Sequence, residues 1–336
     1  MCSKEIIASI RGAGPLILDG GLATELEAQG FGLQGDPLWS SRLLHTNPQA
    51  IQDAHFRFLD SGADVVSTAT YQASIDGFMK HLDMSLESAQ ELMKSGVHLA
   101  QEAVQQFVTS NNDTERGRPL VAGCVGAYGA FLLDGSEYSG GYAETMSIEE
   151  LKAWHRPQIS CLVSAGADLV ALETIPSVKE AEALMELLRE FPSCKAWLSF
   201  SCKDGRSLCD GSPFLEAVRL AQRCSQLVAV GVNCCSPVLI RPLLETVSPL
   251  RSPDLPWVVY PNSGEEWDRL SGWNASGSKV SSIAELSQEW LKQGATMIGG
   301  CCRVGPTHIT ELRKHLLIKF PCCMKVDEPF RTTADT

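Results

Sequence analysis

The sequence has no uninterrupted apolar run of the ~18 residues that a membrane-spanning helix needs. At its amino-terminal end it also lacks the basic stretch followed by an apolar stretch that marks a secretory signal. Basic residues are in the minority, with 28 lysines and arginines against 40 aspartates and glutamates and a formal net charge of −12. This balance argues against a phosphate-backbone partner, which clustered basic residues would bind. We therefore expect no membrane and no nucleic-acid partner.

The cysteines lack the spacing of a redox protein. None of the thirteen stands three residues from another in a C-x-x-C pair. The odd count and the absence of a secretory signal predict reduced thiols in the cytoplasm rather than a disulfide framework. A thiol redox or metal-carrier protein stays open as a different class of function, and the zinc content of the protein would distinguish it from an enzyme.

Eight short apolar runs, each bounded by glycine, proline or polar clusters, alternate with amphipathic stretches, as in repeated βα units. The expected strands are Pro15–Asp19, Asp64–Thr70, Pro119–Val125, Asp168–Glu173, Ala196–Ser201, Leu227–Asn233, Trp257–Asn262 and Thr296–Cys301. Helical periodicity is clearest in Ile148–Ala165, Ser177–Glu190, Pro213–Cys224, Ser282–Gln293 and Pro306–Leu317.

Eight such units in one chain predict a (β/α)₈ TIM barrel. We expect a single domain over residues 1–320 and a short polar tail over residues 321–336. A doubly wound open sheet is the competing fold. It would be expected to carry a G-x-G-x-x-G fingerprint after its first strand, and Asp19-Gly20-Gly21-Leu22-Ala23 does not have that form.

Two of the expected strands end in adjacent cysteines, Cys234-Cys235 after the sixth and Cys301-Cys302 at the eighth. Functional groups of a barrel lie at the carboxyl ends of its strands, so the two pairs should meet. Thiolates bind zinc tetrahedrally, and a catalytic site keeps one of the four positions open. The plainer alternative is ordinary buried thiols, and spacing alone does not separate Cys234 from Cys235 as a ligand.

The geometry of the second pair depends on where its strand ends. Successive side chains on a strand point to opposite faces, so Cys301 and Cys302 can face one ion only beyond the strand. Gly299 and Gly300 give the backbone the freedom to leave the strand there. Asn233, ahead of the other pair, could hold a thiolate or a substrate by hydrogen bonding, or could simply form a turn.

Six segments together resemble one known family over nearly the whole chain. They are Asp19-Gly20-Gly21-Leu22-Ala23-Thr24-Glu25-Leu26, Asp36-Pro37-Leu38-Trp39-Ser40, Thr68-Ala69-Thr70-Tyr71-Gln72-Ala73-Ser74, Glu173-Thr174-Ile175-Pro176, Gly231-Val232-Asn233-Cys234 and Gly299-Gly300-Cys301-Cys302-Arg303. In these motifs the sequence resembles the homocysteine S-methyltransferase family. The resemblance implies a (β/α)₈ barrel that holds one zinc ion per chain.

The resemblance also implies roles for individual residues. It implies Cys234, Cys301 and Cys302 as the zinc ligands and leaves Cys235 without a role. It further implies that Asp19 and Glu173 grip the ammonium group of the amino-acid substrate. No catalytic side chain is expected, because zinc coordination itself deprotonates a bound thiol.

The implied reaction is methyl transfer from a sulfonium donor to the thiolate of L-homocysteine, which yields methionine. S-methylmethionine is the donor that the compact chain favours, with S-adenosylmethionine as a further candidate. A betaine-type donor, or selenocysteine as the acceptor, stays open. Because cations favour aromatic faces, Trp39, Tyr71, Tyr128 and Trp273 are the candidate donor-binding residues. We expect a monomer or a weak oligomer.

Overall fold

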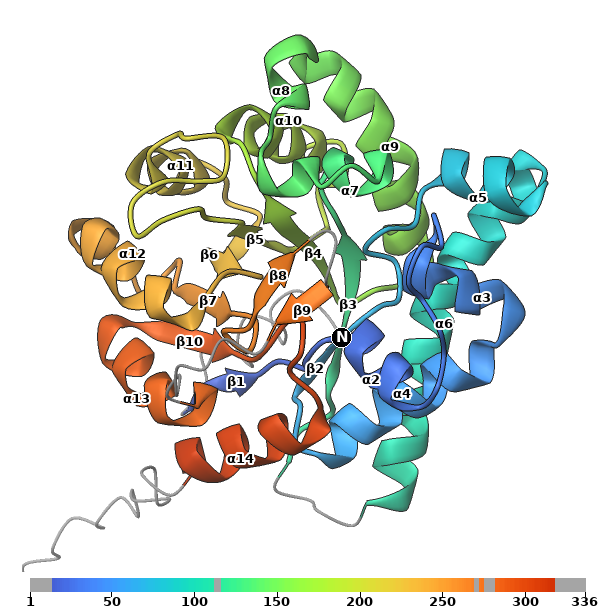
Figure 1. Ribbon diagram of the computed structural model, residues 1–336, viewed down its shortest axis with the longest axis horizontal. Coiled ribbons are helices and arrows are strands. Elements are labelled where there is room, and N and C mark those ends of the chain that lie inside the picture. Colours follow the sequence, from blue (N-terminus) through green and yellow to red (C-terminus); the bar gives the residue numbers. More distant parts are fainter. Residues whose placement is uncertain (1–13, 112–115, 269–271, 275–281, 318–336) are drawn as a thin grey trace, which may run out of the picture.

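The computed structural model describes residues 14–111, 116–268, 272–274 and 282–317. Eight parallel strands form one sheet in the order β1-β10-β7-β6-β5-β4-β3-β2. A parallel bridge between Leu18 and Val65 joins the first strand to the second. The strands therefore form a ring with helices around it, which confirms the predicted (β/α)₈ barrel (Figure 1). The expected tail at residues 321–336 lies outside the described residues.

The elements follow the predicted alternation. The barrel strands are β1 Leu16–Ile17, β2 Val65–Ser67, β3 Leu120–Val125, β4 Leu169–Ile175, β5 Ala196–Phe200, β6 Leu227–Asn233, β7 Trp257–Tyr260 and β10 Ala295–Ile298. The α-helices are α2 Leu22–Ala28, α3 Leu43–Thr46, α4 Pro48–Asp60, α5 Ile75–Leu82, α6 Leu86–Ser110, α7 Tyr128–Leu132, α8 Tyr142–Thr145, α9 Ile148–Ser164, α10 Val178–Leu188, α11 Phe214–Ala221, α12 Ile240–Val247, α13 Ile283–Gln293 and α14 Pro306–Leu317. Short 3₁₀ turns are η1 Trp39–Arg42, η2 Ser136–Tyr138, η3 Pro237–Leu239 and η4 Ser248–Leu250.

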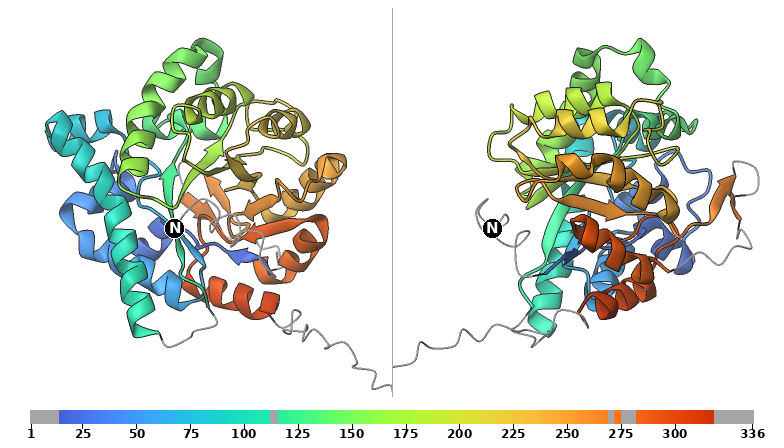
Figure 2. Two further views of the ribbon diagram at one scale, coloured as in Figure 1. Left: turned by 180° about the vertical axis from the view of Figure 1, so that it is seen from behind. Right: turned by 90° about the vertical axis from the view of Figure 1, so that its left-hand side faces the viewer.

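One element has no counterpart among the predicted strands. The antiparallel hairpin of β8 Glu266–Asp268 and β9 Gly272–Asn274 is inserted between β7 and α13. In the right-hand view of Figure 2 it stands out from the barrel. Its strands are short and carry no long apolar run, and for this reason the sequence pattern did not reveal them.

Helices α5, α6, α9, α10 and α13 begin where a serine side chain accepts a free N–H group of the first turn. Ser282 forms a full capping box with Glu285 at the start of α13. Ser177 accepts the N–H of Glu180 at the start of α10, and a glutamate three residues after a serine is the spacing of a capping box. The Glu180 carboxylate does not return to the cap, however, but binds His155 and two groups of the β3–α9 loop inside the protein.

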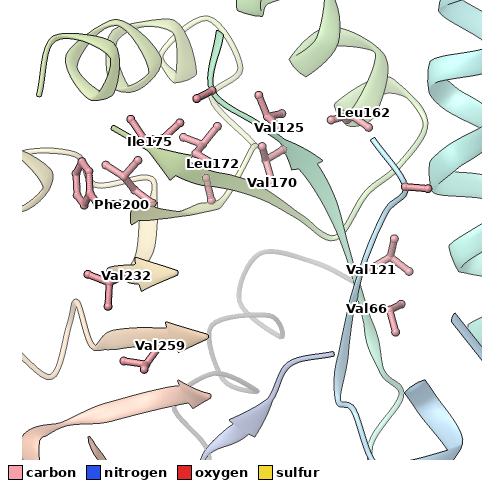
Figure 3. Packing of buried hydrophobic residues seen from close by; sticks show 14 of the residues in the cluster. Val66, Val121, Val125, Leu162, Val170, Leu172, Ile175, Phe200, Val232 and Val259 are labelled. Atoms are coloured by element: carbon pink, nitrogen blue, oxygen red, sulfur yellow. The ribbon is translucent and has the colours of Figure 1, made fainter. Parts of the chain in front are cut away.

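Side chains of the strands alternate between two apolar layers, because the period of a strand is two. One layer lies between the strands and the helices, and Figure 3 shows Val66, Val121 and Val170 in it, with Leu162 of α9 nearby. The other layer fills the barrel interior and contains Val65, Leu120, Ala122, Leu169, Ala171, Trp197, Val258, Tyr260 and Met297. The same alternation carries residues 124 and 173 onto the interior side at the ends of β3 and β4.

Candidate active site

The carboxyl ends of the strands bring polar and thiol groups together above the apolar interior. Inside the barrel, the Nε1 of Trp197 donates to the Tyr260 hydroxyl at 2.9 Å. Tyr260 pairs with Asn233 across β6 and β7 and hydrogen-bonds Glu173, and Cys124, Glu173 and Asn233 are all almost fully buried. Buried polar groups are costly unless they are paired, so several of them in one place call for an explanation. Because the active sites of such barrels lie at the carboxyl ends of the strands, this cluster is the candidate functional site.

The thiols of Cys234, Cys301 and Cys302 form one cluster. Their Sγ atoms all lie within 4.8 Å of one another, and the Sγ atoms of Cys234 and Cys302 are 3.5 Å apart. In a tetrahedral thiolate site with Zn–S bonds of about 2.3 Å, neighbouring sulfurs are about 3.8 Å apart. The cluster therefore fits a soft divalent metal with three thiolate ligands and a fourth position left for another group.

Glycines position the turn that carries Cys301 and Cys302. A Cβ atom at Gly21 would lie 2.6 Å from the Cys301 carbonyl oxygen, and one at Gly20 would lie 2.1 Å from that of Val304. The N–H of Gly21 donates to the Val304 carbonyl at 2.8 Å. The D-G-G segment after β1 and the G-G-C-C segment after β10 are thus packed backbone to backbone. Strand β10 ends at Ile298, so both cysteines lie beyond the strand, as their shared orientation requires.

The two adjacent cysteines after β6 differ in environment. Cys234 has a left-handed backbone, with a φ of 49°, and its thiol joins the cluster. Hydrogen bonds from Cys301, Cys302 and the Tyr138 hydroxyl hold the pKa of the Cys234 thiol well below its usual range. Cys235 is buried in the apolar core, and burial raises the pKa of its thiol. The structure thus brings together the three cysteines that the resemblance implied and places the fourth elsewhere; their role as ligands stays a prediction.

Asp19 is a buried carboxyl at the end of β1. It accepts the Ser67 N–H at 2.7 Å and the Ser67 hydroxyl at 3.2 Å. Burial raises the pKa of Asp19 to about 8, the nearby charge of Glu173 adds to the rise, and the Ser67 hydrogen bonds oppose it. A carboxyl in this state gains from a bound cation, which would restore its ionised form.

Glu173 is the second buried carboxyl, at the end of β4. The Cys124 thiol donates a hydrogen bond to its Oε1. Burial raises the pKa of Glu173 to about 7, although the hydrogen bonds from Cys124 and Tyr260 oppose the rise. The pairing of β4 with β5 shifts register between Leu172 and Ile175, so Glu173 sits on an irregularity of the kind often found beside active sites.

Asn233 holds this irregularity in place. Its Oδ1 accepts the Thr174 N–H and its Nδ2 donates to the Thr174 hydroxyl, both at 2.8 Å. Thr174 needs this support because its φ of 60° lies in the left-handed region, which is strained for a β-branched residue. The structure gives Asn233 a positioning role beside Glu173, and its expected contact with substrate stays a prediction.

The four candidate aromatic residues do not form one group. Trp39 and Tyr71 make an edge contact with ring centroids 6.2 Å apart. Burial raises the pKa of the Tyr71 hydroxyl, and the negative charges of Glu137, Cys234 and Glu173 add to the rise, so this pair lies close to the site. Tyr128 instead packs against Phe131, Tyr142 and Trp154. The side chain of Trp273 lies outside the described residues.

Two residues of the site were missed by the sequence reasoning, and both lie on η2 of the long loop between β3 and α9. The Tyr138 hydroxyl is 3.2 Å from Cys234 Sγ, although its residue is 42% exposed. Glu137 is half-buried, and burial together with the charge of Cys234 raises its pKa to about 7. Neither residue follows a predicted strand directly, so only the course of the loop brings them to the cysteines.

Known proteins resemble this chain over most of its length. The model of the family described as homocysteine S-methyltransferase matches residues 16–316. The betaine-homocysteine S-methyltransferase of Drosophila melanogaster is 42% identical over 295 residues, covering 84% of this chain and 88% of the relative. The homocysteine S-methyltransferase of Escherichia coli (strain K12) is 42% identical over 300 residues, covering 89% and 94%. The selenocysteine Se-methyltransferase of Brassica oleracea var. italica is 41% identical over 313 residues, covering 90% and 89%.

A solved structure agrees with these relatives. The metallated form of the homocysteine methyltransferase MmuM from Escherichia coli superposes with a TM-score of 0.81 at 39% identity, covering 91% of this chain and 98% of the other. Within the described residues no helix is long and apolar enough to cross a bilayer. The expected oligomeric state and cellular compartment stay predictions.

Proposed function

Because the chain belongs to the homocysteine S-methyltransferase family, we propose that it transfers a methyl group from S-methylmethionine to L-homocysteine with the help of one zinc ion. The products are two molecules of methionine. The observation that carries the proposal is the cluster of three thiols within 4.8 Å at the mouth of the barrel, beside two buried carboxyls.

Cys234, Cys301 and Cys302 would hold the zinc ion. When bound, zinc lowers the pKa of a thiol that coordinates it, so the thiol is present as thiolate. A metal held by these three cysteines would supply the acidity that turns the homocysteine thiol into a thiolate, so no protein side chain would be needed as a general base. Among the described residues the buried His55 and His155 lie on helices α4 and α9 rather than at strand ends, which agrees with this view.

Asp19 and Glu173 would bind the ammonium group of homocysteine. Both carboxyls are buried, and the pKa values of about 8 and about 7 show that their ionised forms are under-stabilised without a cation. A bound ammonium group would supply the missing charge and favour ionisation. Asn233 supports this contact by fixing Thr174, the residue after Glu173.

The methyl transfer then balances without a further reactant. A lone pair of the homocysteine sulfur forms the new S–CH₃ bond, and the S–CH₃ bond of the donor breaks with its electron pair left on the donor sulfur. The sulfonium donor becomes a neutral thioether, and the homocysteine proton has already been released to solvent. Selenocysteine could replace homocysteine as the acceptor in the same steps.

Purified protein with homocysteine and each donor in turn, assayed for methionine, tests the proposal. We expect turnover with S-methylmethionine and one tightly held zinc ion per chain. Cys301→Ser or Cys302→Ser should remove both the zinc and the activity. A protein that keeps full turnover after complete removal of metal would show that the zinc proposal is wrong.

The substrate contact has a separate test. A hydrogen bond to a charged group contributes ~1.5–3 kcal/mol, so Glu173→Ala should weaken homocysteine binding by roughly 10- to 100-fold. The zinc content should be unchanged, since Glu173 is not part of the thiol cluster. An unchanged homocysteine dissociation constant would remove Glu173 from the binding site.

A further inference from the structure

The loop between β3 and α9 carries an acid that the proposed mechanism does not use. Glu137 Oε2 is buried and has no hydrogen-bond partner among the described residues. A buried acceptor that is left unpaired is destabilising, and more so when it is charged. Such an atom in a native protein calls for an explanation, and a ligand that supplies a hydrogen-bond donor would be one.

The position of Glu137 is fixed rather than incidental. Its carbonyl oxygen accepts the Ser201 hydroxyl at 3.0 Å, and a Cβ atom on Gly129 would come within 2.4 Å of its nitrogen. The loop around it is anchored by Glu180 of α10, whose carboxylate accepts the Tyr128 N–H at 2.8 Å and the Tyr142 hydroxyl. The backbone of Glu137 is therefore tied to the residue after β5 through Ser201, and its loop is tied to α10 through Glu180.

Glu137 lies beside the thiol cluster. The charge of Cys234 adds to the burial that raises the pKa of the Glu137 carboxyl. In the same way, the charge of Glu137 adds to the burial that raises the pKa of the Tyr71 hydroxyl. The next residue, Tyr138, places its hydroxyl 3.2 Å from Cys234 Sγ. The surroundings of Glu137 thus combine a carboxylate, the Trp39–Tyr71 ring pair and the exposed ring of Tyr138.

These surroundings suit one kind of ligand. Aromatic faces attract a sulfonium or another cation, while the unpaired carboxylate oxygen needs a hydrogen-bond donor. An α-amino-acid sulfonium offers both, because it carries a sulfonium and an ammonium group. Betaine offers a cation for the aromatic faces but no hydrogen-bond donor: its quaternary nitrogen has no N–H, and its carboxylate would approach the Glu137 carboxylate.

We infer that Glu137 accepts a hydrogen bond from the ammonium group of the methyl donor and selects an α-amino-acid sulfonium over betaine. This inference depends on the proposed function, and it assigns a second ammonium site, distinct from Asp19 and Glu173. The equally similar relatives carry names that point to different donors or acceptors, so the choice of donor in this chain needs such a local determinant.

Steady-state kinetics of zinc-loaded Glu137→Gln test the inference with four donors. S-methylmethionine and S-adenosylmethionine carry an ammonium group, dimethylsulfoniopropionate is a sulfonium without one, and betaine has neither a sulfonium nor an N–H. We expect the KM for the two ammonium donors to rise at least tenfold. The kcat/KM for dimethylsulfoniopropionate, or its inhibition constant if turnover is slow, should stay within about twofold, because it offers nothing for Glu137 to bind.

Two controls separate a local effect from a general one. Glu144→Gln removes an exposed carboxylate of α8 on the same loop and should behave as wild type. The homocysteine dissociation constant and the zinc content of Glu137→Gln should equal those of wild type, and its thermal midpoint should not fall below that of wild type, because the variant removes a buried charge. Glu137→Asp keeps the charge one methylene further away and should give an intermediate KM.

Three results would overturn the inference. One is an unchanged KM for both ammonium donors, another is an equal loss with every donor, and the third is wild-type protein that uses betaine but not S-methylmethionine. The first two results leave the proposed function intact, and the third changes its donor but not methyl transfer to homocysteine. Wild-type protein that transfers no methyl group from any donor would instead refute the proposed function, and this inference with it.

Discussion

The two sides of the barrel mouth are built in different ways. On one side the thiols of Cys234, Cys301 and Cys302 follow strands β6 and β10 within a few residues, and close backbone packing against Gly20 and Gly21 holds them. Next to these thiols, on what we call the loop side, Glu137 and Tyr138 arrive on a long loop that side-chain contacts with α10 hold in place. Groups at strand ends belong to the rigid barrel, whereas groups on the loop can change without altering it.

The largest expected effect is on metal binding, and it distinguishes Cys234 from the adjacent Cys235. Cys234→Ala removes one of three clustered thiols, so metal should be lost and activity should fall by more than the roughly 10- to 100-fold typical of outer-shell changes. Cys235→Ala is the matched control. It removes a thiol from the apolar core and should lower the thermal midpoint but keep one metal ion per chain. Metal analysis and activity assays of both variants check this, and equal metal loss in both would contradict the assignment.

The next effect concerns the backbone contact that supports the thiol side. In Gly21→Ala the new Cβ would lie 2.6 Å from the Cys301 carbonyl oxygen, so the turn after β10 must move. We expect metal affinity to fall by roughly 10- to 100-fold, as for other changes that misplace a ligand. Gly32→Ala, where the Cβ meets nothing within 4 Å, is the control and should bind metal normally. Competition with a chelator of known affinity measures both.

The buried carboxyl of Asp19 should affect how the stability of the protein depends on pH. The folded protein keeps the Asp19 proton up to a pKa of about 8, whereas the unfolded chain loses it near 4. Between these values unfolding releases a proton, so the metal-free protein should become less stable as pH rises, by at most about 1.4 kcal/mol per pH unit for this group. Asp19→Asn should reduce that slope. Denaturant unfolding at a series of pH values measures it, and an unchanged slope would argue against the raised pKa.

The smallest effect is expected on the loop side. Tyr138→Phe removes a hydroxyl 3.2 Å from Cys234 Sγ but leaves the three thiols in place. A net contribution of ~0.5–1.5 kcal/mol corresponds to a change of roughly 2- to 12-fold in metal affinity or turnover. Chelator competition and steady-state assays would detect it. Complete loss of metal in this variant would mean that the loop, too, is part of the metal site.

The sequence predicted the barrel because each strand is a continuous apolar run and each run is followed by helical periodicity. It also located Asp19, Glu173 and the cysteine pairs, since these follow the runs directly. It did not reveal the β8–β9 hairpin, which has no apolar signature. The role of Asn233 as the support of Thr174 was also missed, because the left-handed φ of Thr174 is visible only in three dimensions.

The sequence by itself determined the order of βα units, the residues that end each strand and the motifs of the family. These depend on local periodicity and on neighbours in the chain. The family motif pointed to Cys234, but only the tertiary structure shows why its thiol and not that of Cys235 faces the cluster: a single residue with a φ of 49° sets the direction of its side chain. Only the tertiary structure also brought Glu137 to the cysteines, since a loop's course depends on contacts with distant residues such as Ser201 and Glu180.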